Sequence, residues 1–135
     1  MNDNVALELQ RVLSQRSVSG SLVVAFSGGI DSLVLLHTVS TFCKKNGSLS
    51  CRAIHVNHGL QSSALSWQAH CEKLCQQFDV PFQSIPVEVS IDKHQSVESA
   101  ARLARYRALF GALDQDEILL TAHHQDDQAE TVMLQ

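Results

Sequence analysis

The chain has 135 residues, of which 44% are hydrophobic and 18% are charged, and its formal net charge is −4. This length suits one domain with an unassisted hydrophobic core, and the composition excludes a disordered or fibrous chain. The acidic balance argues against a free-standing polynucleotide binder, because such proteins present a basic surface to the phosphates. We therefore expect residues 1–135 to form a single domain, and any nucleic-acid substrate would need basic surface from outside the chain.

Short apolar runs alternate with helical periodicities along the chain. The expected elements, in chain order, are a helix at residues 4–14, a strand at 21–26, a helix at 32–45, a strand at 51–56, a helix at 63–78, a strand at 82–89, a helix at 96–113 and a strand at 117–122. A last helix is expected to start near Gln125 and to run to Gln135. Because no helix cap follows it, we expect the chain to be a C-terminally truncated part of a longer protein.

This alternation predicts an α/β fold. Strands separated by helices indicate right-handed βαβ units and a doubly wound parallel sheet with helices on both faces, in a Rossmann-like arrangement. We expect the strand order 3-2-1-4, in which the first and fourth strands are neighbours where the winding reverses. Ligands of such sheets bind outside the C-terminal ends of the strands at that point.

The four cysteines, Cys43, Cys51, Cys71 and Cys75, include no C-x-x-C pair. We interpret them as reduced thiols packed in or near the core, with a metal or sulfur-carrier role as the weaker alternative. The N-terminus shows no basic segment followed by an apolar stretch, and no apolar run approaches the roughly 20 residues that span a bilayer. These features predict a cytoplasmic protein.

The first predicted strand is followed by the hexad S-G-G-I-D-S, which opens the next helix. Backbone N–H groups converge at such a junction, so it can bind phosphate. Two successive glycines permit a tight turn and a close approach, and Asp31 suggests Mg²⁺ bridging the carboxylate and the phosphates. The alternative is a glycine turn with an Asp or Ser helix cap. The candidate nucleotide ligands are Ser27, Gly28, Gly29, Ile30, Asp31 and Ser32.

The hexad lacks the lysine of a G-x-x-x-x-G-K-S/T loop and does not match G-x-G-x-x-G. S-G-G-x-D-S instead resembles the motif of the PP-loop ATP pyrophosphatases. The resemblance implies the adenine nucleotide alpha hydrolase-like form of the Rossmann-like fold. It also implies cleavage of ATP between the α and β phosphates and transfer of AMP to a carbonyl oxygen.

Two further segments carry candidate ligands. H-V-N-H-G-L, at residues 55–60, follows the second strand, where His55 would lie beside the phosphate loop. E-S-A-A-R-L-A-R-Y, at residues 98–106, places Glu98, Arg102 and Arg105 on one helical face. Ordinary loop histidines and a solvated Glu–Arg face are the alternatives. An arginine near the helix start could contact ATP phosphate or the substrate, because its guanidinium is planar and always charged.

The segment T-A-H-H-Q-D-D-Q-A-E-T, at residues 121–131, is the second candidate centre of chemistry. If it is helical from about His123, then His123, Asp127 and Glu130 occupy one face. An acidic helix cap explains a single Asp there. Two His, two Asp and one Glu within eight residues are better explained by a metal or ammonium site.

All three segments are similar to motifs of the tRNA(Ile)-lysidine synthetases, a group of PP-loop ligases. The resemblance implies that Asp127 holds Mg²⁺ or the incoming amine, that Glu130 orients the lysine ammonium, and that His123 or His124 contacts phosphate or transfers a proton. The implied catalytic residues are Asp31, Arg102, Asp127 and Glu130, the implied nucleotide ligands are the loop residues with His55 and His123, and the implied metal ligands are Asp31 and Asp127.

The resemblance further implies the substrates ATP, L-lysine and an isoleucine tRNA with a CAU anticodon. The wobble cytidine would be adenylated, and lysine would then displace AMP to form lysidine. Two alternatives remain: a tRNA thiolation enzyme of the same family, against which the missing C-x-x-C counts, and a non-catalytic nucleotide-binding module. The 135 residues alone are expected to be inactive on tRNA, and a homodimer remains open.

Overall fold

The computed structural model describes residues 20–45, 47–57, 63–88, 96–125 and 128–134. The described elements, in chain order, are β1 (Gly20–Ala25), α2 (Ile30–Lys45), β2 (Leu49–Asn57), α3 (Ala64–Gln77), β3 (Phe82–Pro86), α4 (Val97–Ala112), β4 (Ile118–Gln125) and β5 (Gln128–Leu134). The predicted helix at residues 4–14 lies outside the described residues. Within those residues, no helix combines the length and apolar character needed to cross a bilayer.

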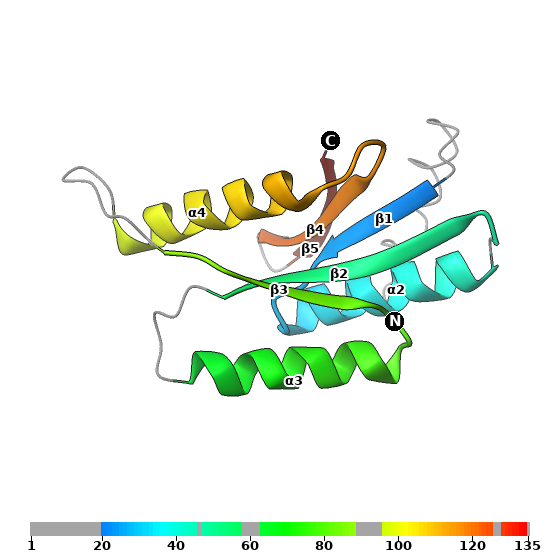
Figure 1. The fold of residues 1–135 in the computed structure, drawn as a ribbon, viewed down its shortest axis with the longest axis horizontal. Helices are drawn as coiled ribbons and strands as arrows, with labels where there is room; N and C mark the ends of the chain where they lie inside the picture. Colours follow the sequence, from blue (N-terminus) through cyan, green and yellow to red (C-terminus); the bar gives the residue numbers. More distant parts are fainter. Residues whose placement is uncertain (1–19, 46, 58–62, 89–95, 126–127, 135) are drawn as a thin grey trace.

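The sheet has the strand order β3-β2-β1-β4-β5 (Figure 1). Strand β1 pairs in parallel with both β2 and β4, and β2 pairs in parallel with β3. The predicted α/β class and the predicted order of the first four strands are therefore confirmed. The chain winds outward from β1 in one direction and then returns to place β4 on its other side, so the winding reverses between β1 and β4.

The predicted last helix is wrong. Residues Gln128–Leu134 form β5, which pairs antiparallel with β4, and β4 itself runs on through His123 to Gln125. A short run such as A-E-T-V-M-L is compatible with either a helix or a strand, so its periodicity does not decide between them. The outer edge of β4 offers unpaired backbone N–H and C=O groups, and the hairpin satisfies them.

Helices cover both faces of the sheet, with α2 and α3 on one face and α4 on the other (Figure 1). Strand β1 shows the alternation that this requires. Leu22 and Val24 pack with the α2 and α3 side, Val23 packs with the α4 side, and all three are fully buried. Because successive side chains of a strand point to opposite faces, the apolar run of β1 serves two cores at once.

Helix α2 begins directly after the loop that follows β1, and its buried stripe fixes its orientation. Leu35, Leu36, Val39 and Cys43 are buried and pack into the core beside Leu22 and Val24. Lys44 and Lys45 lie in its last turn and Asp31 in its first, as the helix dipole favours. The N-terminus of α2 is thereby held at the C-terminal end of β1.

Candidate nucleotide-binding site

The loop between β1 and α2 turns three successive backbone N–H groups toward hydroxyl oxygens. The amides of Ser27 and Gly28 donate to Ser32 Oγ at 3.3 and 3.2 Å, and the amide of Gly29 donates to Ser27 Oγ at 3.3 Å. Ser32 Oγ donates in turn to the Gly29 carbonyl at 3.1 Å, and the two hydroxyl oxygens lie 2.9 Å apart. A phosphate oxygen is the same kind of acceptor as these hydroxyls, so the loop can exchange them for a phosphate.

Gly28 adopts a conformation that other residues would not tolerate. Its φ is +88°, in the left-handed region. A Cβ at this position would lie 2.7 Å from Cys71 Sγ and 2.9 Å from Trp67 Cζ2. At Gly29 a Cβ would meet only Ser27 Oγ, at the ordinary contact distance of 3.6 Å. The first of the two glycines is therefore the one that the geometry requires.

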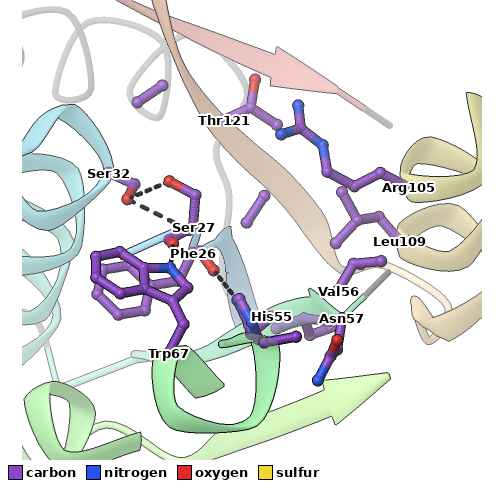
Figure 2. Close-up of a pocket in the computed structure, with 14 residues that line it drawn as sticks. Phe26, Ser27, Ser32, His55, Val56, Asn57, Trp67, Arg105, Leu109 and Thr121 are labelled. Carbon is purple, nitrogen blue, oxygen red and sulfur yellow. Dashed lines mark hydrogen bonds between the residues drawn. The ribbon is translucent and has the colours of Figure 1, made fainter. Parts of the chain in front are cut away.

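A cavity of about 290 Å³ opens beside this loop, at the C-terminal ends of β1, β2 and β4 (Figure 2). Its volume is close to the lower end of the usual range for small-ligand sites, roughly 300–1,000 Å³. The lining combines an apolar majority with a few polar groups, as such sites usually do. The lining residues are Ala25, Phe26, Ser27, Ser32, Ile54, His55, Val56, Asn57, Ala64, Trp67, Arg105, Leu109, Thr121 and Ala122.

His55 lies in the cavity wall with its ring orientation fixed. Its side chain is buried, and its Nδ1 lies 3.0 Å from the carbonyl oxygen of Phe26 (Figure 2). Because a carbonyl can only accept, Nδ1 carries the proton and donates. The ring also stacks on Phe82, with centroids 6.2 Å apart. His55 is thus fastened to the residue that precedes the phosphate loop.

Arg105 extends from α4 into the same cavity, toward the side where Thr121 of β4 lies (Figure 2). Its Nε is buried and has no hydrogen-bond partner among the described residues. Its guanidinium carbon lies 5.2 Å from the centroid of the Tyr106 ring, which supports it from one side. A buried guanidinium N–H without a partner is costly in the free protein, so the arrangement favours an anionic or carbonyl-bearing ligand here.

A family model described as a PP-loop domain matches residues 1–135. The chain belongs to this PP-loop family. Residues 27–32 are its PP-loop, and the loop geometry described above is the part of the fold that the family name refers to.

Relatives of this PP-loop chain carry the name tRNA(Ile)-lysidine synthase. The protein of Histophilus somni strain 2336 is 45% identical over 127 residues, which are 94% of this chain and 29% of that protein. The protein of Coxiella burnetii is 41% identical over 128 residues, 95% of this chain and 28% of that protein. The protein of Pseudomonas putida is 50% identical over 110 residues, 82% of this chain and 25% of that protein. The chain thus spans less than a third of these three relatives.

Solved structures share the fold at low sequence identity. A U34-tRNA thiolase from Methanococcus maripaludis matches 93% of this PP-loop chain and 46% of its own, with a TM-score of 0.66 and 15% identity. An NH3-dependent NAD synthetase from Campylobacter jejuni matches 87% of this chain and 52% of its own, with a TM-score of 0.53 and 18% identity. At these identities the likeness establishes the fold alone.

The structure brings some of the predicted site residues of this PP-loop domain together and leaves others apart. Ser27, Ser32 and His55 line the cavity, and Gly28 and Gly29 lie in the loop beside it. Ile30 is 81% exposed and begins α2, and the half-buried Asp31 follows it.

The two arginines of α4 separate. Arg102 is exposed and is not part of the cavity wall, whereas Arg105, three residues further along, lines it. Arg105 precedes the buried Leu109 by one helical turn, so it shares the stripe that faces the sheet. Helical spacing alone predicted that the two arginines share a face, and it did not show which of them reaches the site.

The third predicted segment has a different backbone from the one expected. His123 and Glu130 lie on the strands β4 and β5, where their backbones are paired across the hairpin, so the predicted helical face of His123, Asp127 and Glu130 does not form. Asp127 lies outside the described residues. Strand β4 reaches the cavity through Thr121 and Ala122, immediately before His123.

Several lining residues of the PP-loop site were not predicted. Trp67, Asn57 and Thr121 belong to the wall, although none stands in a recognised nucleotide-binding pattern. Asn57 donates to Gln68 Oε1 at 2.8 Å, which ties the end of β2 to α3. The position of Asn57 and Thr121 at strand C-termini was the available sign, because side chains there face the ligand crevice.

The thiols fit the predicted role of reduced core residues. All four cysteines are free, and Cys43, Cys71 and Cys75 are buried. Burial raises the pKa of Cys71 to about 11 and the pKa of Cys75 to about 12. Such thiols remain protonated near neutral pH, so they are poor nucleophiles and poor metal ligands.

Proposed function

We propose that this chain is the ATP-binding part of a tRNA(Ile)-lysidine synthetase. The observation that carries the proposal is the convergence of the Ser27, Gly28 and Gly29 amides beside a cavity of about 290 Å³ at the switch point of the sheet. Relatives that are 41–50% identical bear this enzyme's name. Because the chain spans only part of them, the complete activity depends on residues outside it.

The proposed reaction has two steps. The C2 oxygen of the wobble cytidine, in an isoleucine tRNA with a CAU anticodon, attacks the α-phosphorus of ATP. The bond from that phosphorus to the bridging oxygen breaks, and pyrophosphate leaves. The side-chain amine of L-lysine then adds at C2, AMP departs with the oxygen, and the amine loses a proton. Lysidine, AMP and pyrophosphate are the products.

Residues of the chain would bind and orient the nucleotide. The cavity between Ile54, Val56 and Leu109 is apolar enough for the nucleoside, and the PP-loop amides face the phosphates. Arg105 would balance charge that develops on the phosphate or on the leaving oxygen. Arg102 and Glu130 are proposed to act on the tRNA or lysine side, and His123 on phosphate.

Mg²⁺ is proposed as the metal that accompanies ATP. No cluster of three or more His, Cys, Asp or Glu side chains that could hold a metal occurs within the described ranges. This is compatible with Mg²⁺, because that ion takes one or two carboxylates and completes its shell with water and substrate phosphates. Asp31, placed next to the loop, and Asp127 would be the carboxylates. When bound, Mg²⁺ would neutralise phosphate charge.

The test measures the products of the intact protein. Mass spectrometry of the tRNA distinguishes lysine addition from the exchange of oxygen for sulfur that a thiolation enzyme would produce, and a coupled assay follows pyrophosphate. We expect lysine addition that depends on ATP and falls at least 100-fold in Asp31→Asn. A thiolated product, or ATP binding without pyrophosphate release, would contradict the proposal in favour of a sulfur-transfer enzyme or a nucleotide-binding module, respectively.

A further inference from the structure

The indole of Trp67 lies directly against the PP-loop, on the first turns of α3. Its Nε1–H donates to the carbonyl oxygen of Ser27 at 2.7 Å. Two of its ring atoms lie 2.9 and 3.0 Å from the place that a Cβ on Gly28 would take. One side chain therefore holds a carbonyl of the loop and also fills the space beside its glycine.

The hydrogen bond fixes one peptide group at both of its ends. The carbonyl of Ser27 and the N–H of Gly28 belong to the same planar trans peptide, so they point in opposite directions. Trp67 holds the carbonyl outward, and the Gly28 N–H consequently points inward, to Ser32 Oγ at 3.2 Å. Glycine tolerates either orientation of such a peptide, so a fixed direction requires an external contact.

The rest of α3 supports this contact. The rings of Trp67 and His70 lie with centroids 4.9 Å apart, and Cys71, one turn after Trp67, is fully buried under Gly28. Trp67 nevertheless remains 45% exposed, which is unusual for so large an apolar side chain. Core packing alone therefore does not account for its place.

We propose that Trp67 is a positioning residue, which sets the Ser27–Gly28 peptide so that the Gly28 N–H faces the phosphate of the bound nucleotide. This inference rests on the proposed phosphate-binding role of the loop. It predicts that the indole acts on phosphate affinity through the backbone and leaves the binding of the nucleoside portion unchanged.

The experiment measures three dissociation constants in the intact protein by calorimetry: for ATP with Mg²⁺, for pyrophosphate with Mg²⁺, and for adenosine. The variants are Trp67→Phe and a protein with benzothienylalanine at position 67, which keeps the ring shape and lacks the N–H. Leu65→Ala is the matched control, because Leu65 belongs to the same turn, is 75% exposed and does not line the cavity. Thermal unfolding confirms that each variant is folded.

We expect ATP and pyrophosphate to bind roughly three- to ten-fold more weakly to both variants, as the loss of one hydrogen bond implies. Adenosine affinity should be unchanged, and Leu65→Ala should match the wild type. If the benzothienylalanine protein binds pyrophosphate as the wild type does, or if adenosine affinity falls as much as pyrophosphate affinity, the inference is overturned while the proposed function stands. A wild-type protein that binds neither ATP nor pyrophosphate would overturn both.

Discussion

Arg52 and Glu117 form a bidentate ion pair that joins β2 to the start of β4 across the intervening strand β1. Nη2 lies 2.7 Å from Oε1 and Nε lies 3.0 Å from Oε2. Arg52 also donates to the carbonyl of Ala112 at 2.9 Å, and Glu117 accepts from the amide of Asp114 at 2.8 Å. The pair therefore fastens the end of α4 to the sheet, at the end of the strands away from the cavity.

The first prediction concerns acid stability. The hydrogen bonds from Arg52 are the largest cause that lowers the pKa of Glu117, from 4.5 to about 2. A lowered folded-state pKa stabilises the fold above pH 4.5, and this contribution disappears as the pH falls through 2. We expect Glu117→Gln to reduce the free energy of unfolding by about 1–3 kcal/mol at pH 7. Urea unfolding between pH 2 and 7 checks this, and a difference that stays constant across the range would contradict it.

The second prediction concerns the two glycines of the PP-loop. Gly28→Ala places a Cβ at a φ of +88° and 2.7 Å from Cys71 Sγ, whereas Gly29→Ala meets only an ordinary contact. We expect Gly28→Ala to lower the free energy of unfolding by about 1–3 kcal/mol and to weaken ATP binding at least ten-fold. Gly29→Ala should be closer to the wild type in both denaturant unfolding and ATP titration. Equal effects of the two substitutions would show that the loop conformation differs from the one described here.

A third prediction separates the two arginines of α4. Arg105→Met keeps the length of the side chain but removes the buried guanidinium from the cavity, so we expect ATP affinity to fall roughly ten-fold or more, since a bond to a charged group contributes about 1.5–3 kcal/mol. Arg102→Met should leave ATP affinity unchanged, because Arg102 is exposed and lies outside the cavity wall. ATP titration measures the first effect. The rate of lysine addition at saturating ATP tests whether Arg102 acts on another substrate.

A fourth prediction ranks the reactivity of the cysteines. A hydrogen bond from Cys43 lowers the pKa of Cys51, and Cys51 is half-buried. Burial raises the pKa values of Cys71 and Cys75 to about 11 and 12. Iodoacetamide at pH 8 should therefore label Cys51 first, because the thiolate is the reactive form. Peptide mass spectrometry over time reports the order, and early labelling of Cys71 or Cys75 would show that α3 opens readily.

Local sequence was sufficient for much of this molecule. The apolar runs around Val23 and Leu119 predicted two neighbouring strands, and the glycine-rich hexad between a strand and a helix predicted the phosphate loop. These features depend on interactions between residues close in the chain, or on runs that must be buried on both faces wherever they lie. The strand order followed from the handedness of the crossovers and not from any single residue.

The tertiary structure decided what a linear pattern leaves open. Residues 128–134 became a strand because the edge of β4 satisfies their backbone groups, although their sequence is also compatible with a helix. Arg105 and not Arg102 entered the cavity because the buried stripe of α4 sets the rotation of that helix. Trp67 reached Ser27 across 40 positions of sequence. Each outcome depends on how separate elements pack together, and that information is distributed over the whole chain.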